Sequence, residues 1–304
     1  MSKFSKCIKK IIHNPFHLFL YICKLPVFHL MPDATYVKLI YRANFGKKLN
    51  LSNPKTYNEK LQWLKLHKKE EKLTMLVDKY LVREFVSNKL GDNYLIPLLG
   101  VWNSFEEIDF DSLPNQFVLK PTHTSGDIFI CKDKDAICYK TLKKTINKWL
   151  KRKYYWLHRE WPYKNIKPRI IAEKLMVDES GYELKDYKFF CFDGKPKYMF
   201  VATDRNVLGE ETKFDFYDMN FNHLPIKNGH ENSKKELKCP ASFDEMKRLA
   251  AILSQGFEHV RVDLYDINGR IYFGELTFYH WSGLVPFEPS EYDLLFGNEI
   301  VLKQ

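Results

Sequence analysis

Hydrophobic spacing divides the chain into a helical first part and a longer part in which strands and helices alternate. From Tyr36 to about Leu90 apolar residues recur every three or four positions, which predicts helices. The pattern predicts one amphipathic helix in "KTYNEKLQWLKLHKK" and a second in "TMLVDKYLVREFVSNKLG", from Thr74 to a C-terminal glycine at Gly91.

The following residues alternate between strand-like and helical patterns. Short strands are predicted in "YLIPLLGVW", "FVLKP" and "DIFICKD", the last two paired across "THTSG". A long basic helix is predicted from Thr141 in "TLKKTINKWLKRKYYWLHREW". Further strands are predicted in "RIIAEKLMV", "DYKFFCFDGKPKYMFVAT" and "KFDFYDMNF", with turns at Asp193-Gly194 and Met219-Asn220, before a helix in "FDEMKRLAAILSQG".

This order of elements indicates an α+β protein with three parts. We expect a basic helical region over residues 1–75, a smaller lobe over 76–172 and a larger lobe over 173–304. No internal repeat or low-complexity linker separates them.

The last strand pair, "VRVDLYDINGRIYFGELTF", carries two carboxylates among apolar residues. If Val260, Val262 and Leu264 point into the core, the period of two places Arg261, Asp263 and Tyr265 on the other face. Glu275 and Thr277 share one face of the return strand. Two facing carboxylates repel unless a cation lies between them, and Mg²⁺ with phosphate oxygens would meet that need. An exposed face with alternating charges fits the spacing equally well.

Two other stretches suit a nucleotide, although each has an ordinary explanation. Lys120 ends a strand and precedes a small-residue turn with Thr124, Ser125 and Gly126, whose amides and hydroxyls can cradle phosphates. In "IIAEKLM", Glu173 stands where a strand edge and a carboxylate could pair with adenine. A plain hairpin and a plain strand end explain the same residues.

Taken in order, these elements resemble the ATP-grasp superfamily over roughly Asp78 to Phe287. The final motif, "RVDLYDINGRIYFGELTFYHWSG", is similar to the magnesium hairpin of D-alanine:D-alanine ligases. With "LSNPKTYNEKLQWLKLH" and "DKYLVREFV", the whole chain resembles most the teichuronopeptide-biosynthesis (TupA-like) branch, whose members tend to belong to cell-surface polysaccharide pathways. The resemblance implies two α+β lobes that clasp a nucleotide, preceded by a helical N-terminal extension.

The resemblance also implies roles for individual residues. For ATP, Lys79 and Lys120 would bind the phosphates, with Thr124, Ser125 and Gly126 in the flap above them. Glu173 and the backbone of Lys174 and Leu175 would bind adenine, and Asp186 would bind the ribose. Secondary candidates for the γ-phosphate are Lys188, Lys213 and Arg205, although each is more often a solvated strand residue. The residues implied for Mg²⁺ are Asp263, Glu275 and Thr277, which stands where the superfamily usually has asparagine. Arg261, with Lys120, would stabilise charge on the transferring phosphoryl group.

The activity implied is that of an ATP- and Mg²⁺-dependent carboxylate–amine ligase. The γ-phosphoryl group would pass to a carboxylate, giving an acyl phosphate that an amine attacks. A uronic acid or related carboxylate of a surface polysaccharide is the expected acceptor. His123 and His280 are candidates for the amine's proton, although a lone histidine is more often structural.

Two further patterns bear on the substrate. The aromatic residues of the predicted basic helix suit stacking on sugars: Trp149, Tyr154, Tyr155, Trp156 and Trp161. A solvated helix that packs on the protein through these aromatic residues is the alternative. The alternative function is a glycosyltransferase, whose D-x-D metal motif is matched in letters at Asp109–Asp111 and Asp133–Asp135.

Composition narrows the partners and the compartment. The formal charge of +10 favours an anionic partner, but no nucleic-acid-binding signature is present. Six scattered cysteines without a C-x-x-C pair fit a reducing cytosol, and no window of about 20 apolar residues predicts a membrane span. The N-terminal lysines (Lys3, Lys6, Lys9 and Lys10) with nearby aromatics would suit the anionic inner face of the cell membrane, although an arm packed on the body is the alternative.

Overall fold

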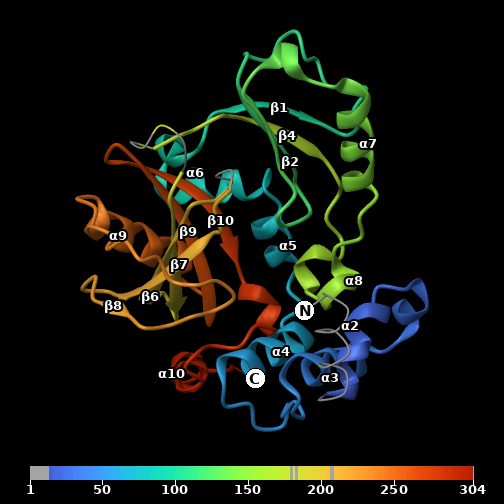
Figure 1. The fold of residues 1–304 in the computed structure, drawn as a ribbon, viewed down its shortest axis with the longest axis vertical. Coiled ribbons are helices and arrows are strands. Elements are labelled where there is room, and N and C mark those ends of the chain that lie inside the picture. Colours follow the sequence, from blue (N-terminus) through green and yellow to red (C-terminus); the bar gives the residue numbers. More distant parts are fainter. Residues whose placement is uncertain (1–13, 179–180, 182–183, 206–208, 304) are drawn as a thin grey trace.

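The structure, a computed structural model, describes residues 14–178, 181, 184–205 and 209–303. It contains a group of N-terminal helices, a small sheet covered by a helix, and a larger sheet with helices on both faces (Figure 1). Both expected lobes are therefore present as separate sheets.

The N-terminal part consists of short helical turns packed on longer helices. The short ones are η1 (Pro15–Leu18), α2 (Phe19–Ile22) and η2 (Pro26–Leu30), and the longer ones are α3 (Asp33–Phe45), α4 (Tyr57–His67), α5 (Glu71–Val77) and α6 (Val82–Leu90). None of the helices in the described ranges is long and apolar enough to cross a bilayer. The four N-terminal lysines expected to meet anionic lipid lie outside the described residues.

One predicted helix is two helices. The prediction from Thr74 to Gly91 is wrong between Asp78 and Leu81, where α5 ends and α6 has not begun. Asp78 accepts hydrogen bonds from the amides of Tyr80 (2.8 Å) and Leu81 (3.2 Å), so its side chain stabilises the turn between the two helices. The expected end at Gly91 is confirmed, with the Gly91 amide donating to the carbonyl of Ser87.

The small sheet has the antiparallel order β1-β4-β2-β3. Its strands are β1 (Leu98–Trp102), β2 (Phe117–Pro121), β3 (Phe129–Cys131) and β4 (Ile170–Lys174). The expected pairing of β2 with β3 is confirmed. One face packs on α7 (Tyr139–Leu150) through Leu142, Ile146 and Trp149. The expected division of lobes near Glu173 falls inside β4.

The prediction of a single long helix from Thr141 is also wrong, because the helix there is α7, which ends at Leu150. It is followed by α8 (Tyr155–His158) and η5 (Trp161–Tyr163). Arg159, with φ of 57°, adopts the left-handed conformation that ends α8, and Pro162 lacks the amide proton needed to continue a helix.

The larger sheet has the antiparallel order β10-β9-β5-β6-β7-β8. Its strands are β5 (Asp186–Phe192), β6 (Lys195–Thr203), β7 (Lys213–Asp218), β8 (His223–Leu224), β9 (His259–Ile267) and β10 (Arg270–Thr277). The turns at Asp193-Gly194 and Met219-Asn220 are confirmed. Asn268 and Gly269 both have positive φ, as a two-residue hairpin turn requires.

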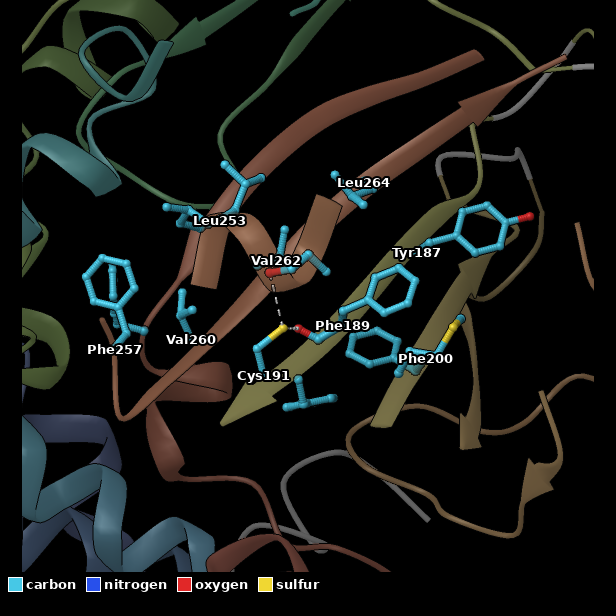
Figure 2. Packing of buried hydrophobic residues seen from close by; sticks show 14 of the residues in the cluster. Tyr187, Phe189, Cys191, Phe200, Leu253, Phe257, Val260, Val262 and Leu264 are labelled. Atoms are coloured by element: carbon cyan, nitrogen blue, oxygen red, sulfur yellow. Dashed lines mark hydrogen bonds between the residues drawn. The ribbon is translucent and has the colours of Figure 1, made fainter. Parts of the chain in front are cut away.

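The two faces of this sheet differ in character. Figure 2 shows Val260, Val262 and Leu264 on the face that also carries Phe189 and lies under Leu253 of α9 (Phe243–Ser254), as expected from the period of two. On the opposite face Phe190 packs with rings from α4 and from α10 (Glu291–Glu299), including Tyr57 and Phe296. The same face carries Asp186, Lys188 and Arg261 beside Phe200 and Phe214.

Candidate functional site

A cleft of about 560 Å³ lies between the two lobes. Its walls come from the α5–α6 turn, β2 and its following turn, α8, β5, β6, β9, β10 and η6 (His280–Gly283). The predicted site residues that line it are Lys79, Lys120, Ser125, Gly126, Glu173, Asp186, Lys188, Arg205, Arg261, Glu275, Thr277 and His280. The structure thus brings together residues that are almost 200 positions apart.

Lys79 and the small-residue turn form the wall on the side of the small lobe. The break between α5 and α6 holds Lys79 at the cleft, where its amide bonds the carbonyl of Thr122 (3.2 Å) and its ammonium bonds that of Thr124. Burial lowers the pKa of Lys79 below its usual value, and the nearby charge of Glu275 offsets only part of that shift. Thr124 itself is buried and donates to Asp127 (2.7 Å), so it shapes the turn and does not line the cleft.

Lys120 and Glu173 form an ion pair at the adenine side predicted from the sequence. The Lys120 ammonium lies 2.8 Å from Glu173 Oε2, and Arg83 of α6 lies 3.3 Å from Oε1. Arg83 lines the cleft but the sequence analysis missed it, because a single arginine on an amphipathic helix carries no motif. Lys174 and Leu175 do not line the cleft, and the Lys174 amide bonds the carbonyl of Pro97 (3.0 Å).

A β-bulge at Gly274 directs the carboxylates of the hairpin. Pairing shifts between Phe273 and Glu275, after which Glu275 opposes Asp263 and Thr277 opposes Arg261. A Cβ atom at position 274 would lie 3.0 Å from the carbonyl oxygen of Asp263, so glycine permits this close approach. The bulge places all four functional side chains on the cleft side of the sheet.

Asp263 is buried under the cleft in a cluster of opposite charges. Arg261 donates to both of its oxygens, from Nε and from Nη2, each at 2.7 Å. Lys188 of β5, paired in register with Asp263, contacts the same carboxylate. The cation that two facing carboxylates need is therefore supplied, at least for Asp263, by the protein itself.

Glu275 differs because it faces the cleft and is 35% exposed. Its Oε1 atom accepts from Arg261 Nη2 (3.3 Å) and from the Thr277 hydroxyl (3.2 Å). Burial alone would raise the pKa of Glu275, but the charges of Lys188, Lys79 and Arg261 lower it to about 2. Glu275 is thus an ionised carboxylate at neutral pH.

The TupA-like ATP-grasp family model matches residues 59–301, most of the chain. The chain belongs to this family. Structural similarity extends to a D-alanine–D-alanine ligase from Bacillus anthracis complexed with ATP, at 16% identity and a TM-score of 0.43, over 68% of this chain and 56% of that one. It extends also to a D-alanine–D-alanine ligase from Helicobacter pylori, at 13% identity and a TM-score of 0.41, over 81% and 69% of the two chains.

A third similar structure is an N5-carboxyaminoimidazole synthase from Aspergillus clavatus in complex with ADP and 5-aminoimidazole ribonucleotide, at 12% identity and a TM-score of 0.39, over 68% of this chain and 46% of that one. The chain spans little more than half the length of the Bacillus ligase. No curated protein matches the sequence.

The carboxylates of this TupA-like chain fit Mg²⁺ in chemistry. Among the described residues no group of three or more His, Cys, Asp and Glu could hold an ion alone, but Mg²⁺ needs only one or two carboxylates beside phosphate oxygens. Glu275 presents such oxygens to the cleft, and Asp186 Oδ1 is buried without a hydrogen-bond partner in the described part of the chain. Asp263 competes poorly, since Arg261 and Lys188 already occupy its oxygens.

Asp186 sits deep in the cleft between two cations. Its Oδ2 atom lies 2.5 Å from the Lys188 ammonium and also contacts Arg205. The unpartnered Oδ1 atom can accept a hydrogen bond from a ribose hydroxyl, the role expected from the sequence, or bind a cation.

The two candidate histidines are buried. Arg261 donates to His280 Nδ1 (2.6 Å), so the other nitrogen carries the proton and donates to Asn228 (2.8 Å). Burial and the charges of Arg261 and Lys188 lower the pKa of His280. The neutral His280 ring therefore accepts the hydrogen bond from Arg261 and orients its guanidinium. His123 bonds the carbonyl of Trp149 (3.1 Å) and does not line the cleft.

The motif behind the glycosyltransferase alternative has local structural roles. Asp109 accepts from the amides of Asp111 (3.1 Å) and Ser112 (3.3 Å), and Asp133 accepts from that of Asp135 (3.2 Å). Both triplets stabilise exposed turns of the small lobe, outside the cleft.

The aromatic residues expected to stack on sugars mostly pack within the protein, which corrects that interpretation. Trp149 belongs to the core of the small lobe, Trp156 stacks on His29, and the Tyr155 hydroxyl donates to Asp33 (2.6 Å). Tyr154 is the member of the predicted set that lines the cleft.

Proposed function

We propose that this TupA-like chain is an ATP- and Mg²⁺-dependent carboxylate–amine ligase that acts through an acyl phosphate. The observation that carries the proposal is the cleft, in which Lys79, Lys120 and the small-residue turn face Arg261 and Glu275. Lysines and turn amides suit phosphate oxygens, and the facing guanidinium and carboxylate suit the metal end of a triphosphate.

Each residue has a role in this reaction. Lys79 and Lys120 bind phosphate oxygens, with the flap residues Ser125 and Gly126 excluding water above them. Glu173 would bind adenine, which requires its carboxylate to share its bonds with Lys120 and Arg83. Lys174 and Leu175 lie outside the cleft, so the expected backbone contact with adenine is not part of the proposal. Asp186 takes the ribose.

The metal end depends on the hairpin. Glu275 would hold Mg²⁺, which supplies positive charge to the phosphate oxygens, and Thr277 would orient Glu275 through the hydrogen bond between them. Asp263, the second expected ligand, would have to share its oxygens between the ion, Arg261 and Lys188. Arg261, fixed by Asp263 and His280, holds its guanidinium toward the transferring phosphoryl group, with Lys188 beside it on the γ-phosphate.

The reaction balances without a protein nucleophile. The acceptor carboxylate takes the γ-phosphoryl group from ATP and leaves ADP, and the amine then displaces phosphate from the acyl carbon and loses a proton. Positioning and the preset charges of the cleft lower the barrier. The acceptor we propose is a uronic acid or related carboxylate of cell-surface polysaccharide, in line with the branch that the sequence resembles.

ADP release is the direct test. Purified protein with ATP, Mg²⁺, glucuronate or galacturonate, and a panel of amino acids should release ADP only when both a carboxylate and an amine are present. Mass spectrometry should show a product equal to acid plus amine minus water. Release of sugar from a nucleotide sugar without ATP would instead support a glycosyltransferase and refute the ligase.

We also propose that the enzyme works in the cytoplasm, with its N-terminal arm at the inner face of the membrane. Large apolar side chains of η1, α2, η2 and the residue before η2 are exposed to solvent: Leu18, Tyr21, Leu25, Val27 and Leu30. Such residues beside a lysine-rich segment suit an anionic bilayer surface. Sedimentation with phosphatidylglycerol vesicles should carry the protein down and should fail for Leu25→Ser/Val27→Ser; equal sedimentation of both would refute the contact.

A further inference from the structure

Three consecutive residues at the end of the cleft have left-handed backbone conformations. The φ angles of Trp281, Ser282 and Gly283 are 48°, 57° and 60°. For residues other than glycine this costs on the order of 1 kcal/mol or more each, so the surrounding structure must hold the turn in place.

Buried polar groups supply that hold. Gln62 of α4 donates to the carbonyls of Ser282 (2.8 Å) and Gly283 (2.7 Å), and Lys65 donates to that of Ser282 (2.6 Å). The Ser282 hydroxyl donates to the buried carboxylate of Glu160. Only glycine fits at position 283, because a Cβ atom there would lie 2.6 Å from the Gln62 amide nitrogen.

The effect of the turn is to project one large ring into the cleft. Trp281 is 40% exposed, whereas its neighbours His280 and Ser282 are 2% and 7% exposed. Trp281 lines the cleft. Holding an exposed indole on a strained turn costs folding free energy. Strained backbone of this kind clusters at sites where side chains contact ligands.

Two other rings and a glycine support this indole. Phe214 of β7 stacks on Trp281 with 25° between the planes, and the His230 ring lies 5.8 Å from it. A Cβ atom at Gly229 would lie 3.1 to 3.3 Å from the indole atoms, so the ring is seated against backbone there. We call Trp281, Phe214 and His230 the aromatic platform.

The neighbours of the aromatic platform are polar and cationic. Thr212, Arg205 and Arg261 line the same cleft. Burial and the nearby charge of Arg205 lower the pKa of His230, so this ring is neutral at pH 7. The exposed indole of Trp281, in a cleft that a hydroxyl and guanidinium groups also line, matches a pyranose ring, whose C–H face packs on aromatics while its hydroxyl and carboxylate groups take hydrogen bonds.

We propose that the aromatic platform binds the sugar ring of the acceptor, with Arg205 and Arg261 attracting its carboxylate. This inference rests on the proposed ligase function and names the subsite that would select a sugar acid over an amino acid. The aromatic platform lies outside residues 143–161, whose aromatic residues were one sequence-based candidate for sugar stacking.

Saccharide binding to the full chain tests the aromatic platform independently of turnover. Calorimetric titration with glucuronate, galacturonate and the neutral parent sugars should show binding, tighter for the acids. Trp281→Ala should weaken it about tenfold, the loss of about 1.4 kcal/mol expected for one stacked ring, and Trp281→Phe should restore much of it. Trp156→Phe, which removes an indole outside the cleft, is the matched control and should bind as the unaltered protein does.

The outcomes separate the two proposals. Equal saccharide affinity in Trp281→Ala, or no saccharide binding by the unaltered chain, would overturn the sugar subsite even if ADP release proceeds with another carboxylate. A loss of ATP affinity in Trp281→Ala with saccharide binding intact would also overturn it, by assigning the aromatic platform to the nucleotide base. Saccharide binding that depends on Trp281, without ADP release under any condition, would leave the subsite standing and refute the ligase.

Discussion

Arg261 and Asp263, two residues apart on β9, are joined by two hydrogen bonds of 2.7 Å beneath the cleft. The period of two places both side chains on the same face. Lys188 of the neighbouring strand β5 forms an ion pair with the same Asp263 carboxylate. The pair fixes the guanidinium plane against the cleft, where charge would develop during phosphoryl transfer. It also makes the Asp263 charge part of the folded core.

Asp263→Asn should therefore destabilise the protein. Removing the charge leaves Arg261 and Lys188 buried with too little compensation, which costs roughly 3–5 kcal/mol. Urea denaturation measures the loss. Asp193→Asn, at an exposed hairpin turn with a solvent-accessible ion pair to Lys303, is the control and should change stability by about 0.5 kcal/mol or less. A change equally small for Asp263→Asn would contradict the buried-pair interpretation.

Glu275→Gln should have the opposite profile, with the fold retained and the activity lost. Its side chain is partly exposed, so the free energy of unfolding should fall by about 1 kcal/mol at most. The rate of ADP release should drop about 100-fold or more, because the ionised carboxylate that would hold Mg²⁺ is gone. Initial rates and urea curves on the same samples give both numbers. Glu231→Gln, in an exposed ion pair with Lys227, should leave both unchanged.

Lys120→Met should weaken nucleotide binding, and Lys174→Met should not. Lys120 lines the cleft, whereas the Lys174 side chain is exposed and lies outside it. Loss of one charge-assisted phosphate contact should raise the Kd for ATP about tenfold or more, as measured by calorimetry. Similar Kd values for the two variants would show that phosphates bind elsewhere.

Acid should destabilise the fold through His259. Tyr57 donates to its Nε2 atom (2.9 Å) and its Nδ1 donates to the carbonyl of Cys191 (3.0 Å), so the buried ring is neutral. Burial lowers the pKa of His259 to about 3, from 6.5. Because the unfolded chain binds the proton more readily, stability is complete above pH 6.5 and is lost as the pH falls toward 3, by up to about 1.4 kcal/mol per pH unit.

Stability curves in urea between pH 7 and pH 4 check this slope. His259→Gln should flatten it, whereas His67→Gln at an exposed position should not. His158, whose pKa is also lowered to about 3 by burial, leaves a residual slope in both variants. An unchanged slope in His259→Gln would assign the acid sensitivity to other groups.

Local patterns in the sequence were enough to predict the elements whose causes are local. The alternation of Val260, Val262 and Leu264 and the turn at Asn268-Gly269 predicted the last hairpin, because side-chain period and turn geometry act within a few residues. The helix predictions from Thr74 and from Thr141 were wrong at their middles. The Asp78 side chain forms the turn that interrupts the first, and the second stops at Leu150, before Arg159 ends α8 with a left-handed backbone. Hydrophobic spacing reveals neither interruption.

By itself the sequence determined the α+β class, the two strand-rich lobes, the hairpin and, through the order of its motifs, membership of the TupA-like ATP-grasp family. Tertiary structure alone decided that Lys188 neutralises Asp263, that Arg83 and Lys120 both form ion pairs with Glu173, and that Trp281 projects into the cleft. These relationships join side chains far apart along the chain or depend on strained backbone. Their energies arise only when the lobes are folded and water is excluded, so no pattern within a short stretch of sequence can encode them.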